Sequence, residues 1–351
     1  MPERKVSHLI QRSLLGLVLG LLYAAAAYDG HYLLPLGAFT GFSIGLITAW
    51  LDHYVFTGKI RRLRFSYVLL IRSLSYLASI FLCLILMGTI YFYSTGARGG
   101  EIFHNLFHNS WVQEGNIFWS VAFSFALILA FQYINLTVRL LGPNTLRNYI
   151  LGKYHKPVEE ERIFMFLDIK GSTTIAEKLG HYRWHNMLND FFFDLAEPVN
   201  VSLGAIYQYV GDEVVISWPK KRGVKNLNVI RCFYRIKKKI DQRQSRYEKR
   251  YGVKISFKAG CHIGKVISGE IGDLKREIVF HGDTVNTASR IQEECNRLGR
   301  EFLISELLLK ELDLGSDFIA EFMGSIHLRG KEVDINLFSI LPVPSTSTDA
   351  P

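Results

Sequence analysis

The sequence predicts an α+β protein in two parts: a helical membrane domain, then a globular domain with a mixed or antiparallel sheet. Two observations lead to this prediction. The chain is 49% hydrophobic with a mean hydropathy of +0.14, and its long apolar runs are confined to residues 1–140. From residue 159 onward, short segments with strand and helix patterns alternate instead.

Four stretches of the first part are about as long as the 20 apolar residues that a helix needs to cross a bilayer. They are residues 13–28, 34–56, 66–93 and 116–138. Asp29 cuts the first stretch short, which would also suit a cleaved signal peptide, but three further spans favour a retained helix.

The basic residues predict the orientation of these spans, because cytoplasmic loops carry an excess of lysine and arginine. Three segments are basic, and their residues are Arg4, Lys5, Arg12, Lys59, Arg61, Arg62, Arg64, Arg139, Arg147, Lys153 and Lys156. The other two loops hold only Arg98, against Asp29, Glu101 and Glu114. We therefore expect an integral protein of the inner or plasma membrane, with both termini and the globular domain in the cytoplasm.

Two features of the membrane half carry polar groups. Arg72 lies within the third span, where it either faces a partner in the bundle or snorkels to the inner interface, and its depth favours snorkelling. His104 and His108 lie four residues apart in an outer loop. An amphipathic interfacial helix accounts for them more simply than a haem or metal site.

Gly142 and Pro143 end the fourth span and open a linker at 141–158, which leads to a globular domain at 159–342. The polar residues 343–351 are expected to form a disordered tail. Four scattered cysteines have no metal-ligand spacing, which argues against a zinc site.

Strand and helix patterns alternate along the globular domain. In chain order we expect strand 163–169, helices at 172–180 and through 191–193, a hairpin of strands 205–210 and 213–218, a basic helix at 224–250, a strand pair at 257–264 and 265–272, a helix at 284–299, and a strand–helix–strand end. The basic helix has one apolar stripe, so we expect a surface helix, with contact to the anionic inner leaflet as the alternative. Nucleic acid is not an expected partner, because no aromatic stacking motif accompanies the basic residues.

Two aspartates lie at the ends of neighbouring strand patterns. Asp168 ends the first strand, in FLDIKGST, and Asp212 lies at the hairpin turn, in YQYVGDEV. Carboxylates brought together there would repel and raise each other's pKa, and bound divalent cations would remove that penalty. Taken singly, Asp168 is equally well a helix cap and Asp212 a turn residue.

Two further segments suit phosphate chemistry. The residues that open the next helix can present backbone N–H groups to phosphate oxygens; they are Lys170, Gly171, Ser172 and Thr173. In HGDTVNTASRIQ, Asn286 and Arg290 lie four residues apart on one helical face. Arginine stays charged and can hold negative charge that develops on a phosphate, while asparagine can orient a sugar oxygen.

Together, the motifs FLDIKGST, YQYVGDEV and GDTVNTASR, in this order within residues 160–340, resemble the class III adenylate and guanylate cyclases. The resemblance implies a ferredoxin-like domain that forms a head-to-tail homodimer with active sites at the interface. It implies a phosphorus–oxygen lyase for intracellular signalling, which converts a nucleoside triphosphate into a 3′,5′-cyclic monophosphate and pyrophosphate. ATP is the expected substrate, because it is the commoner one in the family.

The resemblance also implies roles for single residues. Asp168, Asp212 and the backbone carbonyl of Ile169 would bind two Mg²⁺ or Mn²⁺ ions. Asn286 and Arg290 would stabilise the transition state in the active site of the other subunit.

A basic residue before a glycine binds the terminal phosphates in the family. HLRGKEV offers Arg329 in that place, with Lys331 as a substitute.

The sequence departs from the family at the two positions that select the base. Adenylate cyclases have lysine and either aspartate or threonine there, and guanylate cyclases have glutamate and cysteine. This chain has Gln208 and Val279. Glutamine can donate and accept hydrogen bonds and valine can do neither, so guanylate or pyrimidine nucleotide cyclisation stays open as an alternative.

Three other functions fit the sequence less well. A diguanylate cyclase would have a second glycine in place of Val210 and would lack the NTASR motif. A non-catalytic, membrane-tethered module that dimerises or binds nucleotide would have lost a metal-binding aspartate or the arginine, and neither is lost. A transporter or channel would need more polar groups in its spans than Arg72.

Overall fold

The chain forms two compact units, Met1–Leu140 and Leu141–Pro351, which are described separately. The computed structural model describes residues 2–27, 34–55, 65–94, 151–274, 276–327 and 334–343, with a few positions between 128 and 148.

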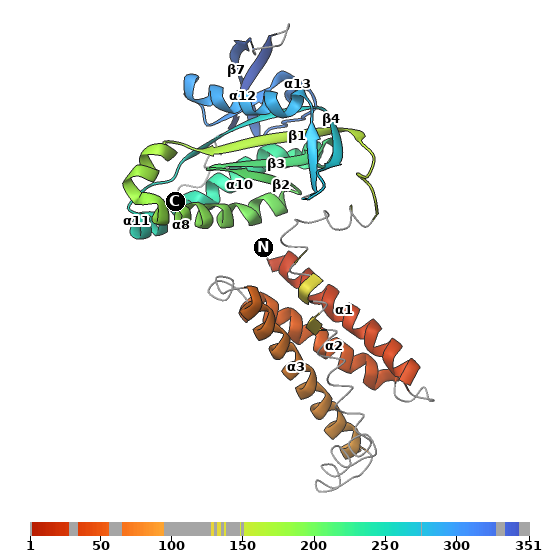
Figure 1. Cartoon of the computed structure of the whole chain (residues 1–351). Coiled ribbons are helices and arrows are strands. Elements are labelled where there is room, and N and C mark those ends of the chain that lie inside the picture. The colour runs from red at the N-terminus through yellow and green to blue at the C-terminus, as the bar shows by residue number, and fades with distance from the viewer. Residues whose placement is uncertain are drawn as a thin grey trace, which may run out of the picture. The chain divides into compact units, whose positions relative to one another are not determined.

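The first unit contains long helices (Figure 1). They are α1 (Pro2–Ala27), α2 (Leu34–Trp50), which continues into the π-helical turn η2 (Leu51–Val55), and α3 (Phe65–Ser94). In the described part of the chain, one helical stretch, Ser66–Cys83, is long and apolar enough to cross a membrane; the apolar stretches Ser13–Leu22 and Ala38–Trp50 are shorter. Most of the fourth predicted span, 116–138, lies outside the described residues. The four-span domain therefore stays a prediction.

Helices α1 and α2 approach closely where both carry glycine. A Cβ atom on Gly16 would lie 2.2 Å from the carbonyl oxygen of Gly41, and one on Gly41 would lie 2.1 Å from that of Gly16. Arg72 of α3 is only 2% exposed, and its guanidinium lies 3.9 Å from the Asp52 carboxylate of η2. The snorkelling interpretation of Arg72 is therefore wrong, because a carboxylate on a neighbouring segment accompanies the buried charge.

In the part of the second unit that the structure describes, eight strands form one sheet. They are β1 (Val158–Ile169), β2 (Ala205–Val210), β3 (Glu213–Pro219), β4 (Phe257–Ile271), β5 (Glu277–His281), β6 (Phe302–Ser305), β7 (Phe318–Ile326) and β8 (Ile335–Pro342). The strand order is β2-β3-β1-β4-β6-β8-β7, with β5 paired to β4. Among the strand pairs that the structure describes, β4–β6 alone is parallel, so the sheet is mixed, as predicted.

Helices connect and cover these strands. They are α8 (Ser172–Val201), α9 (Lys220–Val224), the 3₁₀ turn η4 (Lys225–Leu227), α10 (Asn228–Asp241), α11 (Gln244–Tyr251), α12 (Asp283–Arg297) and α13 (Glu306–Lys310). Strands β1 to β4, with α8 and α10, follow the β-α-β-β-α-β order of a ferredoxin-like fold. Figure 1 shows α8, α10 and α11 on one side of the sheet and α12 on the other.

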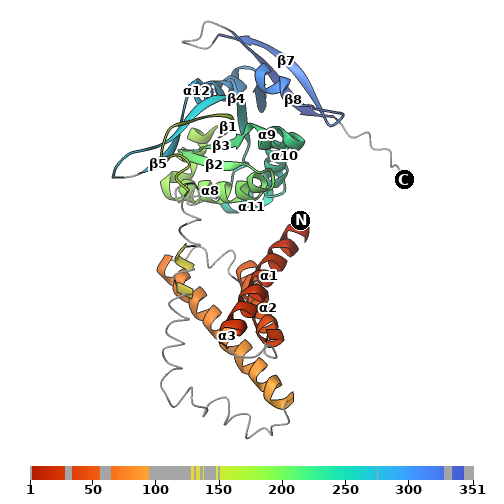
Figure 2. The same ribbon diagram turned by 90° about the vertical axis from the view of Figure 1, so that its right-hand side faces the viewer.

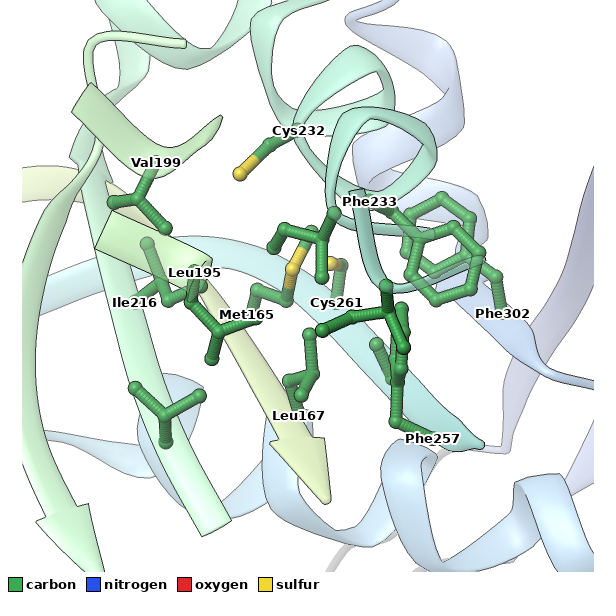
Figure 3. Close-up of a cluster of buried hydrophobic side chains, with 14 of the residues drawn as sticks. Met165, Leu167, Leu195, Val199, Ile216, Cys232, Phe233, Phe257, Cys261 and Phe302 are labelled. Atoms are coloured by element: carbon green, nitrogen blue, oxygen red, sulfur yellow. The ribbon is translucent and has the colours of Figure 1, made fainter. Parts of the chain in front are cut away.

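The main core lies between the sheet and helices α8, α10 and α11. The side chains of β1 alternate between the two faces, and Met165 and Leu167 point into this core. They meet Leu195 of α8, while Phe233 of α10 stacks on Phe302 of β6 at 4.3 Å between ring centroids (Figure 3). Both faces of β1 are buried from Arg162 to Leu167, and its second half, from Ile163 to Ile169, is an almost continuous apolar run.

Asp168 belongs to the opposite face of β1. The alternate residues Phe164 and Phe166 pack there against Ala288 of α12 and Val266 of β4. By the same alternation, Asp168 faces α12. The core on the α8 side of the sheet thus fixes β1, and β1 in turn positions the Asp168 carboxylate on the α12 side.

Glycine allows α12 to lie close to the sheet. A Cβ atom on Gly260 of β4 would lie 2.2 Å from the backbone nitrogen of Gln292, and one on Gly264 would lie 2.4 Å from the Thr284 hydroxyl. The Thr284 hydroxyl also donates to the Lys265 carbonyl at 2.8 Å.

The structure corrects three predicted elements. The strand pair at 257–264 and 265–272 is the single strand β4, because Gly264 serves the approach of α12 and forms no turn. The basic helix at 224–250 is broken by Asn226 and Leu227, which have positive φ, and again between α10 and α11. The predicted strand–helix–strand end has a further strand, since β7 and β8 form a hairpin. The hairpin of β2 and β3, with Gly211 and Asp212 at its turn, is confirmed.

Gly260→Ala is expected to lower the free energy of unfolding by about 2 kcal/mol or more, because the new methyl group meets helix backbone that cannot rotate away. Gly269→Ala is the matched control on the same strand. Its Cβ would be 3.6 Å from the nearest atom, so we expect a change below about 0.5 kcal/mol. Thermal unfolding of the purified chain measures the stability of both variants. Equal losses of stability in the two would contradict the close approach of α12 to β4.

Candidate active site

The structure brings Asp168 and Asp212 together. Leu167 of β1 pairs with Val214 of β3, so the end of β1 lies beside the β2–β3 turn that carries Asp212. The Asp212 carboxyl therefore lies beside that of Asp168, close enough for its charge to raise the pKa of Asp168. Gly211 makes this turn possible, since its φ of 62° is one that other residues rarely adopt.

Neighbouring acids disfavour the ionisation of Asp168 and of Glu213. Burial, followed by the hydrogen bond and charge of Asp212, raises the pKa of Asp168 to about 6, while Lys258 acts in the opposite direction. Burial and then the charges of Asp168, Asp212 and Glu293 raise the pKa of Glu213 to about 7. The site therefore holds more negative charge than the protein alone neutralises.

Two buried side chains hold Asp168 in place. Lys258 is its partner in the β1–β4 pairing, and the Lys258 ammonium lies 3.4 Å from Asp168 Oδ2. Gln292 of α12 donates from Nε2 to the same oxygen at 3.2 Å. Lys258 is 6% and Gln292 3% exposed, so water does little to weaken either contact.

This acidic pair fits a hard divalent cation. Asp212 Oδ2 is buried without a hydrogen-bond partner, and an unpaired buried carboxylate oxygen is costly unless a cation or a donor reaches it. Carboxylate and carbonyl oxygens are the ligands that Mg²⁺ and Mn²⁺ prefer. No group of three or more acidic, histidine or cysteine side chains that could hold a metal occurs in the described ranges. Further oxygens would have to come from the backbone, as at Ile169, or from a bound phosphate.

The segment after Asp168 opens helix α8. Gly171 is its N-terminal cap, with φ 67° and no side-chain hydrogen bond to the first turn, where Ser172 and Thr173 lie. Such first-turn N–H groups lack partners within the helix and suit an anion. Lys170 is less suited: its N–H donates to the Ser256 carbonyl at 2.9 Å, and its ammonium lies 3.7 Å from Glu301.

Asn286 and Arg290 lie one turn apart on α12. Asn286 is exposed and Arg290 is partly buried. The opposite face of α12 carries Ile291 and Cys295, which pack into the core and fix the helix. The pair is thus presented from a rigid helix.

The two positions that the sequence predicts to select the base lie on different hairpins. Gln208 is exposed on β2, opposite Val215 of β3. Val279 is partly buried on β5, opposite Gly269 of β4. Four other residues singled out in the sequence, His104, His108, Arg329 and Lys331, lie outside the described residues.

Comparison with known proteins identifies the family of the second unit. Residues 154–340 match the family model described as the adenylate and guanylate cyclase catalytic domain. The chain belongs to this cyclase family. The class III resemblance and the α+β fold of residues 154–340 are thereby confirmed.

Curated relatives carry the same domain. Adenylate cyclase 2 of Rhizobium meliloti (strain 1021) is 38% identical over 201 residues, which are 57% of this chain and 55% of the relative. An adenylate cyclase of Anabaena cylindrica is 23% identical over 209 residues, 59% of this chain and 41% of the relative. The chain thus spans about half the length of these relatives.

A solved structure supports the fold. The structure of a bacterial light-regulated adenylyl cyclase superposes with a TM-score of 0.54 at 21% identity, covering 62% of this chain and 64% of that one.

Sequence reasoning missed three residues of this acidic site. Lys258 stands out as a lone charge within the apolar strand FKAGC, and Glu213 follows Asp212 directly. Gln292 lies two positions after Arg290, so its side chain leaves α12 on a different face, the one that contacts the sheet. A charge inside a strand pattern was the available signal for Lys258.

The acidic pair predicts that removing one carboxylate raises stability in the absence of metal and weakens metal binding. Without divalent ions, Asp212→Asn should raise the free energy of unfolding at pH 7.5 by on the order of 1 kcal/mol, because it removes the charge facing Asp168. The pKa of Asp168 is higher in the folded protein than its ordinary 3.8, so the folded state binds more protons. The wild type should therefore lose stability as pH rises from about 4 to about 6, and the variant should lose less.

Thermal unfolding in chelator across this pH range measures the effect, and added Mn²⁺ should stabilise the wild type far more than the variant. Asp273→Asn, at an exposed acid of the β4–β5 turn, is the control and should change neither quantity. If Asp212→Asn is less stable than the wild type at every pH, the proposed repulsion between Asp168 and Asp212 is contradicted.

Proposed function

We propose that this chain is an adenylate cyclase, which converts ATP to 3′,5′-cyclic AMP and pyrophosphate in a homodimer. The observation that carries the proposal is the Asp168–Asp212 pair, which the pairing of β1 with β3 brings together at the strand ends of a cyclase-family domain. The 38% identity to an adenylate cyclase of Rhizobium meliloti supports ATP as the substrate.

Two Mg²⁺ or Mn²⁺ ions would be held by Asp168, Asp212 and the backbone carbonyl of Ile169. The unpartnered Oδ2 atom of Asp212 and the raised pKa of Asp168 support this assignment. Bound there, the ions would favour ionisation of the ribose 3′-hydroxyl and neutralise charge on the triphosphate. Lys258 and Gln292 keep the Asp168 carboxylate oriented for that role.

In the reaction, the ribose 3′-oxygen loses its proton and forms a bond to the α-phosphorus. The bond from that phosphorus to the oxygen of the β-phosphate breaks, and pyrophosphate leaves. Gly171, Ser172 and Thr173 would bind phosphate oxygens through the first turn of α8. Arg329, or Lys331, would bind the terminal phosphates.

Asn286 and Arg290 would act on the site of the opposite subunit. Asn286 of the partner subunit would orient the ribose, and Arg290 of the partner subunit would hold the charge that grows on the α-phosphate. Their presentation from the rigid helix α12 supports these roles, because transition-state contacts require fixed geometry.

A homodimer is supported by apolar side chains exposed at two hairpins. Val210 is 50% exposed at the end of β2, and Ile271 is 50% exposed at the end of β4. Figure 2 shows β5 and the end of β4 extending away from the rest of the unit. Leu274, in the turn between these two strands, is fully exposed. Exposed apolar groups of this kind favour a protein interface.

The base selectivity of the site rests on Gln208 and Val279. Gln208 is exposed on the α12 side of the sheet, where it can donate to and accept from a purine edge. Because Val279 adds no polar contact, we expect GTP and the pyrimidine triphosphates to compete more than in a site with two polar selectors.

Residues 1–140 would anchor the enzyme through four membrane helices, with a linker at 141–158, the catalytic domain at 159–342 and a tail at 343–351. Leucines of α1 and α3 are exposed, and hydroxyls such as Ser75 and Thr89 bond to carbonyls of their own helix, as suits a lipid environment. The glycine contact of α1 with α2 matches small-residue packing in membranes. The full chain should stay with membranes through an alkaline carbonate wash.

The dimeric site predicts complementation between two inactive variants. Asp168→Ala and Arg290→Ala should each lower the rate of cyclic AMP formation, identified by mass, by roughly 100-fold or more. Co-expressed, they should recover about a quarter of the wild-type rate, because half of the dimers are mixed and one of their two sites is intact.

Co-expression of Asp168→Ala with Asp212→Ala is the matched control. Every site in these dimers lacks a metal ligand, so no recovery is expected. Absence of cyclic AMP from the wild type with ATP and Mn²⁺ would contradict the activity, and absence of recovery would contradict the shared site.

A further inference from the structure

Strand β2 contains a bulge directly before the first base-selecting residue. Ile206 pairs with Ile216 and Gln208 with Val215, so Tyr207 is an extra residue without a partner in β3. Val215 faces the cluster on the α12 side of the sheet, and Tyr207 packs against the same cluster. The bulge therefore places Tyr207 and Gln208 on one face, although consecutive strand residues normally face opposite ways.

The Tyr207 side chain reaches across to the second base-selecting hairpin. Its ring meets that of Phe280 edge to face, with centroids 4.9 Å apart. The Phe280 N–H donates to the Tyr207 hydroxyl at 3.4 Å. Strands β2 and β5 are not neighbours in the sheet, so this contact joins two hairpins that the strand pairing leaves apart.

Arg162 and Phe164 of β1 form the floor of this contact. The Arg162 guanidinium lies 4.4 Å from the centre of the Phe280 ring, and Phe164 meets Phe280 edge to face at 5.5 Å. Arg162 is 6% exposed and is itself held, since it donates to Ser217 at 2.9 Å and to Glu160 at 3.2 Å. The Arg162 guanidinium is thus held in place against the face of the Phe280 ring and restrains its position.

Gln208 and Val279 are the immediate neighbours of Tyr207 and Phe280 in the chain. We propose that Tyr207 and Phe280 are positioning residues, whose contact sets the spacing between Gln208 and Val279 and so shapes the purine pocket. This rests on the proposed function, in which those two positions receive the base. Val279 cannot hydrogen-bond, so the fit of the base depends on shape and on the placement of Gln208.

The test compares a ligand that has a base with one that has none. ATP and inorganic tripolyphosphate are each titrated into the full-length chain with Ca²⁺, and their dissociation constants are measured by calorimetry. Tyr207→Leu should weaken ATP binding about tenfold and leave tripolyphosphate binding within about twofold, because only the base pocket widens. Phe280→Leu should give the same pattern, and the double variant should lose little more, since both remove one contact.

Tyr209→Leu is the matched control on the same strand. Tyr209 lies on the opposite face, where its ring packs on Phe192 of α8 at 4.4 Å. It should leave the ratio of the two dissociation constants unchanged. Tyr207→Phe keeps the ring and removes only the hydroxyl, so it should fold as the wild type does and weaken ATP binding by about two- to threefold.

Equal weakening of both ligands by Tyr207→Leu, or the same ATP loss in Tyr209→Leu, would overturn the proposal. If Tyr207→Leu fails to fold, the ratio of the ATP and tripolyphosphate dissociation constants in Tyr207→Phe is used instead, and an unchanged ratio would overturn the proposal. A wild type that binds ATP but forms no cyclic AMP would overturn the proposed activity alone, and the ligand ratio would still decide the role of Tyr207. A wild type that binds ATP no better than tripolyphosphate would overturn the positioning role.

Discussion

The site depends on an unfavourable interaction: two carboxyl groups held so close that one of them resists ionisation. Asp168 and Asp212 are kept together by strand pairing between β1 and β3, and neither strand can move without disturbing the core beneath it. Lys258 and Gln292 orient Asp168 but leave the pair with excess negative charge. A site built this way gains most when divalent cations arrive, which ties metal affinity to the stability of the sheet.

The remaining parts of the domain position the other residues of the proposed site. Glycine at 260 and 264 lets α12 lie on the sheet, so that one helix both contacts Asp168 through Gln292 and presents Asn286 and Arg290. The aromatic contact between Tyr207 and Phe280 joins the hairpins that carry the two proposed base-selecting positions. Close packing with little freedom to relax is what a site for phosphoryl chemistry requires, since small displacements there cost rate.

The sequence predicted the elements whose signals are local. The β2–β3 hairpin follows from Gly211 and Asp212 between two apolar runs, and the mixed sheet follows from alternating strand and helix patterns. The sequence wrongly predicted a turn at Gly264. A glycine that lets a helix pack closely on a strand cannot be told from a turn glycine by its sequence neighbours. The bulge at Tyr207 and the Lys258–Asp168 contact depend on pairing between distant strands, so no local pattern contains them. Arg72 was misjudged for the same reason, since its partner Asp52 lies on another segment.

Proton release on metal binding tests the central claim most directly. Mn²⁺ is titrated into the full-length chain at pH 6 and pH 8, in pairs of buffers with different ionisation enthalpies, and the released protons are obtained from the difference in heat. With the pKa of Asp168 raised to about 6, binding should release about half a proton or more per site at pH 6 and close to none at pH 8. Binding at pH 6 with no proton release would show that the two carboxyls are already ionised side by side, and would contradict the account.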